Sequence, residues 1–129
     1  MEKVATVTSL NSFEKLVAWQ CARLLTKQVY EITANFPKDE QFGLTNQMRR
    51  AANSIGANMA EGFSRQTIAD KLHFYSMAPG SLTELQSFLY TALDVSYIDE
   101  KQKTLPYNQS VKTHKLITGL MKSTKRKTR

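Results

Sequence analysis

Hydrophobic residues along this 129-residue chain recur at the spacing of α-helices. From Phe13 to Ile32 they return every three or four positions, and Ser12 stands where an N-cap would. Pro37 ends the segment, because proline lacks an amide hydrogen and disfavours helical geometry in the residue before it. The pattern predicts a first helix over residues 12–35. No alternating pattern flanked by turn residues predicts a β-strand.

Three further helices follow, at residues 42–62, 67–96 and 100–122. In the third, Thr67 could form a capping box with Asp70, and Pro79 should kink the helix because its ring crowds the preceding turn. In the fourth, Pro106 should either kink the helix or delay its start. Four helices with short connections predict an all-α, antiparallel up-and-down four-helix bundle over residues 1–121.

The third helix has more apolar surface than one bundle can bury. Beyond its main apolar stripe it carries Phe74, Met77, Phe88 and Tyr90. A single four-helix bundle would leave part of this surface exposed, so we expect the chain to assemble as a homo-oligomer.

Charge is divided unevenly along the chain, whose net charge is +7. Residues 1–100 hold nine lysines and arginines against eleven acidic residues, whereas residues 101–129 hold nine lysines and arginines and no acidic residue. Residues 122–129 lack an apolar anchor, so we expect a mobile basic arm. Such an arm suits a nucleic-acid backbone, but it equally suits a solubilising tail. Its candidate contacts are Lys122, Lys125, Arg126, Lys127 and Arg129.

Location is suggested by what the sequence lacks. No apolar run is long enough to cross a membrane, and the first residues do not resemble a signal peptide. We therefore expect a cytoplasmic protein that does not bind membranes. The single cysteine, Cys21, lies in an apolar helical pattern and is interpreted as a buried thiol.

The second helix carries an ordered row of polar residues beside its apolar stripe. The row consists of Gln47, Arg50, Ser54, Asn58 and Glu61. Small neighbours such as Ala51 and Gly56 should let another helix approach closely, so the row is expected to form a polar seam between helices, with Glu84 as a partner. Arg49 points about 100° away from Arg50 and is the better candidate to reach solvent or phosphate.

Catalytic and metal-binding patterns are weak. His73 and His114 lie on different predicted helices, and neither has a second ligand at helical spacing. Gly-rich phosphate loops are absent, so no enzyme activity, metal or cofactor is expected. Trp19, Tyr75, Tyr90, Tyr97 and Tyr107 could stack on bases, although on helices such residues are more often core or interface.

Several blocks of the sequence closely resemble one known family. They are FPKDE from Phe36, QMRRAA from Gln47, SIGANMAEG from Ser54 and GSLTEL from Gly80. The resemblance covers residues 13–121 and is to the bacterial four-helix-bundle proteins encoded in intervening sequences of 23S ribosomal RNA genes. Relatives of that family include the accessory variability determinant of diversity-generating retroelements.

The resemblance implies a homopentamer with a basic surface that binds RNA or DNA, and in the retroelement relative the assembly also binds a reverse transcriptase. Pro79 departs from the family pattern, where a basic or polar residue is common, so a contact on the third helix is lost. Arg49, Arg65, Lys71 and the C-terminal arm remain as candidate contacts.

Two functions follow from these observations. The first is a non-catalytic, oligomeric accessory or scaffold that binds the nucleic-acid backbone, with steep salt dependence. The second is a protein-interaction scaffold, for example for a reverse transcriptase, whose basic arm has no role in binding nucleic acid.

Overall fold

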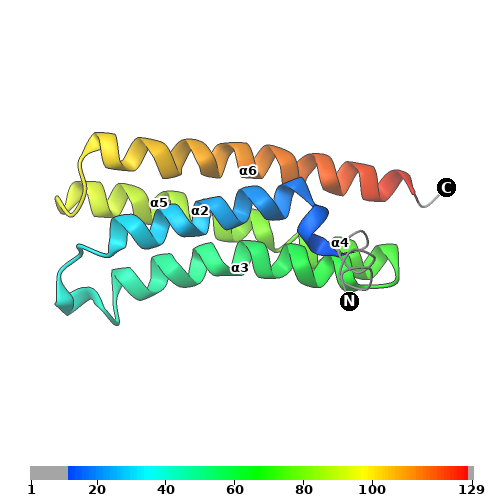
Figure 1. The fold of residues 1–129 in the computed structure, drawn as a ribbon, viewed down its shortest axis with the longest axis horizontal. Coiled ribbons are helices and arrows are strands. Elements are labelled where there is room, and N and C mark those ends of the chain that lie inside the picture. The colour runs from blue at the N-terminus through cyan, green and yellow to red at the C-terminus, as the bar shows by residue number, and fades with distance from the viewer. Residues whose placement is uncertain (1–11, 128–129) are drawn as a thin grey trace, which may run out of the picture.

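The computed structural model describes residues 12–127, in which every regular element is helical (Figure 1). Four long helices, α2 (Val17–Thr33), α3 (Leu44–Ser64), α5 (Ala78–Asp94) and α6 (Glu100–Arg126), form the bundle. A short helix, α4 (Ile68–Tyr75), precedes α5, and the 3-10 turns η1 (Phe13–Lys15) and η2 (Lys38–Glu40) precede α2 and α3. The prediction of an all-helical bundle is confirmed.

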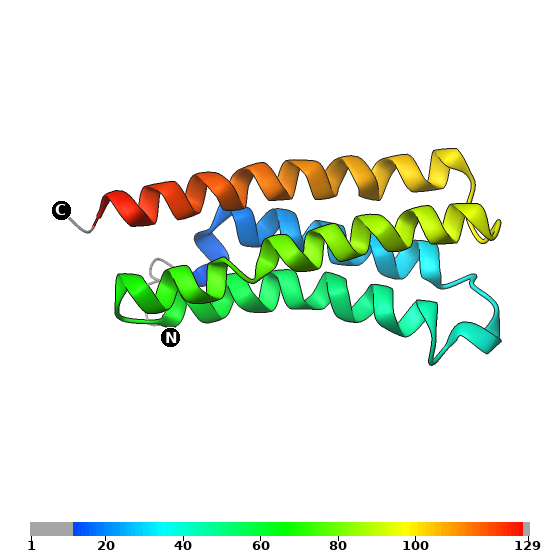
Figure 2. The same ribbon diagram turned by 180° about the vertical axis from the view of Figure 1, so that it is seen from behind.

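The long helices form a four-sided arrangement. Helix α2 packs against α3 and α6, and α5 packs against the same two helices, so α3 and α6 lie diagonally opposite each other. Figures 1 and 2 show α2 and α5 running in one direction and α3 and α6 in the other. The core contains side chains from every long helix, among them Leu25, Val29, Met48, Ile55, Met59, Leu82, Leu85, Leu89 and Ile117. Cys21 is buried, as predicted.

The first helix starts later than the sequence pattern predicts. Residues 13–15 form the turn η1, and Leu16 then adopts an extended conformation, with φ −71° and ψ 120°, before α2 begins at Val17. Ser12 does not cap a helix, because its hydroxyl donates to the Glu14 carboxylate at 2.8 Å. The predicted continuous helix from Ser12 is therefore wrong over its first turn.

The predicted third helix is two helices. Ser76 and Met77 separate α4 from α5, and Pro79 lies in the first turn of α5. Proline is tolerated there because the amides of a first turn have no partner within the helix. A break replaces the predicted kink and removes its energetic cost. At the start of α4, the Thr67 hydroxyl accepts a hydrogen bond from the Asp70 amide at 3.1 Å.

Helix α6 is continuous through Pro106. It starts at Glu100 because Asp99 and Gln102 form a reciprocal capping box at its N-terminus. At the other end, Thr124 is buried and its hydroxyl donates to the Leu120 carbonyl at 2.8 Å. Because Thr124 is buried, the last turn packs against the bundle and the helix extends to Arg126.

The prediction of a mobile arm from residue 122 is therefore wrong for residues 122–126, since these residues belong to α6. Lys127 forms the C-cap of the helix. Arg129 lies outside the described residues.

Glu40 fixes the connection between α2 and α3. One oxygen of its carboxylate accepts from the Leu44 amide at 3.0 Å, and the other accepts from the Tyr97 hydroxyl at 2.8 Å. These two hydrogen bonds hold the pKa of Glu40 below its ordinary value. Glu40 thus caps α3 in place of Gly43, which has no side chain, and links this connection to the one between α5 and α6.

Helix α4 rests on α3 at a glycine. A Cβ atom built on Gly62 would lie 2.6 Å from Cε1 of Tyr75, so only glycine allows the Tyr75 ring this close to α3. Helix α4 therefore packs closely against α3 at this end of the bundle, where it also contacts α6. Within residues 12–127, none of the helices combines the length and apolar character needed to cross a membrane.

Candidate nucleic-acid interface

Five basic residues form a stripe along the outward side of α6. Lys101, Lys112, Lys115, Lys122 and Arg126 are separated by close to whole numbers of turns, so they share one side of the helix. All five are exposed, and the buried residues of α6 lie on the opposite side. At about 1.5 Å per residue, the stripe is about 37 Å long. We call it the α6 stripe.

The charges of the α6 stripe are not neutralised within the described chain. Among residues 12–127 the ion pair present joins Arg65 to Glu61, on α3 and its C-cap. From Lys101 to Lys127 there is no acidic residue. A row of unpaired cations on a rigid helix can displace the counterions of a polyanion without first breaking salt bridges of its own.

A groove between α5 and α6 lies beside the stripe. It has a volume of about 250 Å³ and is lined by Thr83 and Gln86 of α5 and by Val111, His114 and Lys115 of α6. Hydroxyl, amide, imidazole and ammonium groups line it without a carboxylate. These groups can donate hydrogen bonds to phosphate or sugar oxygens, so the groove extends the binding surface of the stripe.

An aromatic cluster joins the same two helices nearer the start of α6. Tyr90 and Tyr107 meet edge to face with ring centroids 5.7 Å apart. The Lys103 ammonium lies 4.4 Å from the centroid of Tyr90 and 4.6 Å from that of Tyr107. Tyr90 is 47% exposed, whereas Tyr75 is buried. Of the tyrosines considered for stacking, Tyr90 is thus accessible beside a cation.

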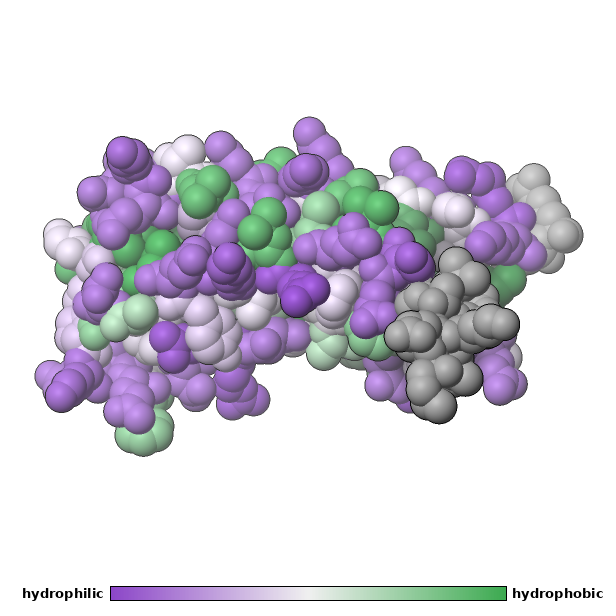
Figure 3. Space-filling view, viewed as in Figure 1, coloured by the Kyte–Doolittle hydropathy of each residue, from purple (hydrophilic) through white to green (hydrophobic). Residues whose placement is uncertain are grey.

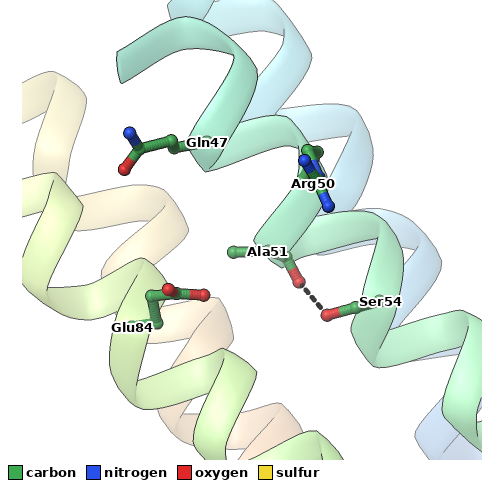
Figure 4. A pocket seen from close by; sticks show the side chains of 5 residues that line it. All are labelled: Gln47, Arg50, Ala51, Ser54 and Glu84. Carbon is green, nitrogen blue, oxygen red and sulfur yellow. Dashed lines mark hydrogen bonds between the residues drawn. The ribbon is translucent and has the colours of Figure 1, made fainter. Parts of the chain in front are cut away.

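The predicted polar seam is an open depression. Gln47, Arg50 and Ser54 of α3 line it, and Glu84 projects toward them from α5 (Figure 4). Its volume is about 310 Å³. The expectation that small neighbours would exclude water here is wrong, because Arg50 and Glu84 are exposed and form no ion pair.

The remaining seam residues bond locally. The Ser54 hydroxyl bonds to that of Ser81 at 2.6 Å and to the Ala51 carbonyl at 2.8 Å. The Asn58 amide donates to the Ser54 carbonyl, one turn earlier, at 2.9 Å. Glu61 pairs with Arg65 at 2.6 Å, four residues along the chain. Of these contacts, the hydrogen bond between Ser54 and Ser81 is the one that joins α3 to α5.

The roles predicted for Arg49 and Arg50 are reversed. The Arg49 guanidinium donates to the Thr33 hydroxyl at 2.9 Å and lies 4.4 Å from the centroid of the Tyr30 ring. It therefore packs against α2, which occupies the side of α3 that had been expected to face solvent. Arg50 is the exposed arginine, without a partner among residues 12–127.

The other candidate cations fall into two groups. Arg65 lies over Phe74, with 4.6 Å to the ring centroid, in addition to its pair with Glu61. Lys71 donates to the Phe63 carbonyl at 2.7 Å. Both are held by intramolecular contacts, whereas Lys122 and Arg126 belong to the α6 stripe. Lys125 and Lys127 lie at the end of the same helix.

Sequence reasoning missed the first part of the stripe, which is Lys101, Lys112 and Lys115. Their spacing to Lys122 and Arg126 follows the helical period, and this was the signal that could have identified them. It was overlooked because the arm was treated as separate from the fourth helix.

Comparison with known proteins agrees with this fold. The structure resembles a solved protein of unknown function from the S23 ribosomal protein family of Bacteroides thetaiotaomicron, with a TM-score of 0.75 and 22% identity. The likeness covers 82% of this chain and 96% of that one. The sequence has no match among curated proteins. Residues 14–119, most of the chain, match the model of the 23S rRNA-intervening sequence protein family. The chain therefore belongs to the 23S rRNA-intervening sequence protein family.

Proposed function

We propose that this protein is a non-catalytic nucleic-acid-binding accessory protein, and that the α6 stripe holds the phosphate backbone of RNA or DNA. One observation carries the proposal. Five exposed cations lie on one side of a rigid helix, and no carboxylate on that helix beyond Glu100 competes for them. An array of this kind recognises backbone charge with little dependence on base sequence.

The number of cations sets the expected salt dependence. If all five contact phosphates, the logarithm of the binding constant should fall against the logarithm of salt concentration with a slope of about −4.5 for duplex DNA and about −3.5 for a single strand. Steep salt dependence combined with weak sequence preference would distinguish this mode from direct base readout.

Self-association would strengthen such contacts, and we propose a homo-oligomer, with the pentamer that the family resemblance implies. Apolar side chains are exposed where α2 meets α6: Val17 is 56% exposed, Leu24 45% and Leu105 63%. Figure 3 shows hydrophobic surface between these helices. A contact with a second copy would bury these side chains. Several stripes on one particle would then bind one strand with a high effective concentration.

The test is fluorescence anisotropy of labelled single-stranded RNA, duplex RNA and duplex DNA at low and physiological salt. The variant Lys112→Gln/Lys115→Gln/Lys122→Gln removes three stripe charges. A matched control, Lys15→Gln/Lys27→Gln/Lys38→Gln, removes three exposed charges elsewhere.

The stripe variant should bind about ten- to a hundredfold more weakly at low salt, and its salt slope should be shallower by about 2 to 3. The control should bind much as the wild type does. Equal losses in both variants would show that net charge matters and the stripe does not. Absence of binding at low salt would reject the proposal.

A second candidate function is a protein-interaction scaffold, and the depression between α3 and α5 favours it. Arg50 and Glu84 present opposite charges there without pairing to each other. A protein partner could satisfy both. In this case the stripe variant would retain partner binding, whereas Arg50→Gln/Glu84→Gln would lose it.

A further inference from the structure

A small recess lies at the end of the bundle where α4 meets α6. Its floor is apolar and is formed by Leu16, Phe63, Ile68 and Leu120, and its volume is about 130 Å³. An engineered apolar cavity of about 150 Å³ in another protein admits a benzene molecule. The recess is therefore of a size to take one aromatic ring.

Two lysines line this recess together. The Lys71 ammonium donates to the Phe63 carbonyl at 2.7 Å and lies 5.2 Å from the Phe63 ring centroid, so two of its three hydrogens remain available. Burial lowers the pKa of Lys71, and the positive charge of Lys127 lowers it further. Among residues 12–127, those that line the recess include no acidic residue. Two cations thus share a partly dehydrated space without a counter-charge, an arrangement that an anion would stabilise.

Tyr75 adds a hydrogen-bond donor to the lining. Its side chain is only 2% exposed, yet its hydroxyl forms no hydrogen bond within residues 12–127. Burial raises the pKa of this hydroxyl, so it stays protonated at neutral pH. The hydroxyl oxygen is not enclosed by the protein, so it is open to the recess and can donate a hydrogen bond to a ligand oxygen there.

We propose that this recess binds the phosphate monoester of a pyrimidine nucleotide, with the phosphate between Lys71 and Lys127 and the ring on the apolar floor. A phosphate monoester carries nearly two negative charges at pH 7, which matches two ammonium groups, whereas a carboxylate or a backbone phosphodiester carries one. The nucleotide could be free or could be the phosphorylated end of a strand. The second source rests on the proposed function, because the strand would then lie along the nearby α6 stripe.

The experiment is calorimetric titration of the full-length protein with uridine monophosphate, uridine and inorganic phosphate. Uridine monophosphate should bind at least tenfold more tightly than either fragment. Lys127→Gln should weaken its binding at least tenfold and Tyr75→Phe severalfold, whereas the control Lys27→Gln, exposed on α2 and outside both the recess and the α6 stripe, should change it less than twofold. Because Lys127 is exposed at the helix end, its variant should fold normally, as circular dichroism would verify.

Equal binding of uridine and uridine monophosphate, equal losses in Lys127→Gln and Lys27→Gln, or no binding would overturn the proposal. A second arm distinguishes the sources by comparing short RNAs that end in a phosphate or a hydroxyl. A preference for the phosphorylated end that Lys127→Gln abolishes identifies the strand end, and its absence identifies a free nucleotide. If the stripe variant binds RNA normally while uridine monophosphate still binds, the proposed function fails and the recess stands.

Discussion

Helix α3 and the outward side of α6 use basic side chains in opposite ways. On α3, the guanidinium of Arg49 is taken up by Thr33 and Tyr30, and that of its C-cap Arg65 by Glu61 and Phe74. On α6, the lysines and arginine of the stripe form no ion pair with any residue from 12 to 127. An intramolecular partner makes a cation part of the architecture, and its absence leaves the charge available to a ligand.

The largest expected effect on stability comes from adding a methyl group to a glycine of α3, and a glycine of α6 provides the comparison. In Gly62→Ala the new Cβ would lie 2.6 Å and 2.7 Å from two ring carbons of Tyr75 and 3.1 Å from the Lys71 carbonyl oxygen. Helix α4 must shift, so we expect destabilisation of about 1 to 3 kcal/mol in urea unfolding.

The matched control for that change is Gly119→Ala, on the outward side of α6. Apart from its chain neighbours and the backbone of α6 itself, no atom of residues 12–127 lies within 4 Å of a Cβ atom placed there. Alanine should stabilise the helix by about 0.5 to 1 kcal/mol and leave RNA binding unchanged. Similar destabilisation in both variants would contradict the division into a packed and an open side.

The two adjacent arginines sharpen the comparison within one helix. Arg49→Gln removes a hydrogen bond to Thr33 and a cation–π contact with Tyr30, so it should destabilise the protein by about 1 kcal/mol. Arg50→Gln should change stability by less than about 0.5 kcal/mol, because its side chain is exposed and unpaired. Thermal unfolding of both variants tests this, and equal effects would mean that the reversed roles are wrong.

Glu40 gives a prediction about pH. Its pKa is lower in the folded protein than in the unfolded chain, so its contribution to stability is present above the ordinary pKa of 4.5 and is lost as the pH falls through the folded value. Glu40→Gln should lower the melting temperature at neutral pH. It should also make stability depend less on pH in the acidic range. Melting curves between neutral and acidic pH measure both effects. If the variant kept the same pH dependence of stability in the acidic range, Glu40 would not be the group responsible for it.

The smallest expected effect concerns single stripe residues. Lys112→Gln or Lys122→Gln alone should make the salt slope shallower by less than one unit and weaken RNA binding severalfold, with no change in unfolding free energy. Lys27→Gln, on the exposed part of α2, is the control. Anisotropy titrations across a salt series would measure the slopes. A loss of stability in the stripe variants would contradict the separation between binding and packing.

Periodicity predicted the helical fold because burial is repeated along each helix, as in the core residues Met48, Ile55 and Met59. It failed where a single contact decides the outcome. The position of α2 determines that Arg49 is packed, and one buried threonine, Thr124, keeps the last turn of α6 helical. Neither contact leaves a repeating signal in the sequence.

The candidate site was predicted only in part, because some of its residues come together through single contacts that the sequence pattern does not show. Charge at the C-terminus pointed to the helix that carries the proposed stripe and included Lys122 and Arg126, but treating it as a separate arm hid the continuous stripe. The recess was not foreseen, because Lys71, Tyr75 and Lys127 come together only through the packing of α4 against α6.

Helix α6 keeps its buried residues and its cations on opposite sides, and this has a consequence for how the protein can change over generations. A lysine on the outer side can be gained or lost without disturbing Thr113 or Ile117, which are wholly buried. If the stripe binds nucleic acid as proposed above, the affinity can therefore drift in small steps while the bundle is preserved. Selection can act on the strength of binding and on folding as two nearly independent traits.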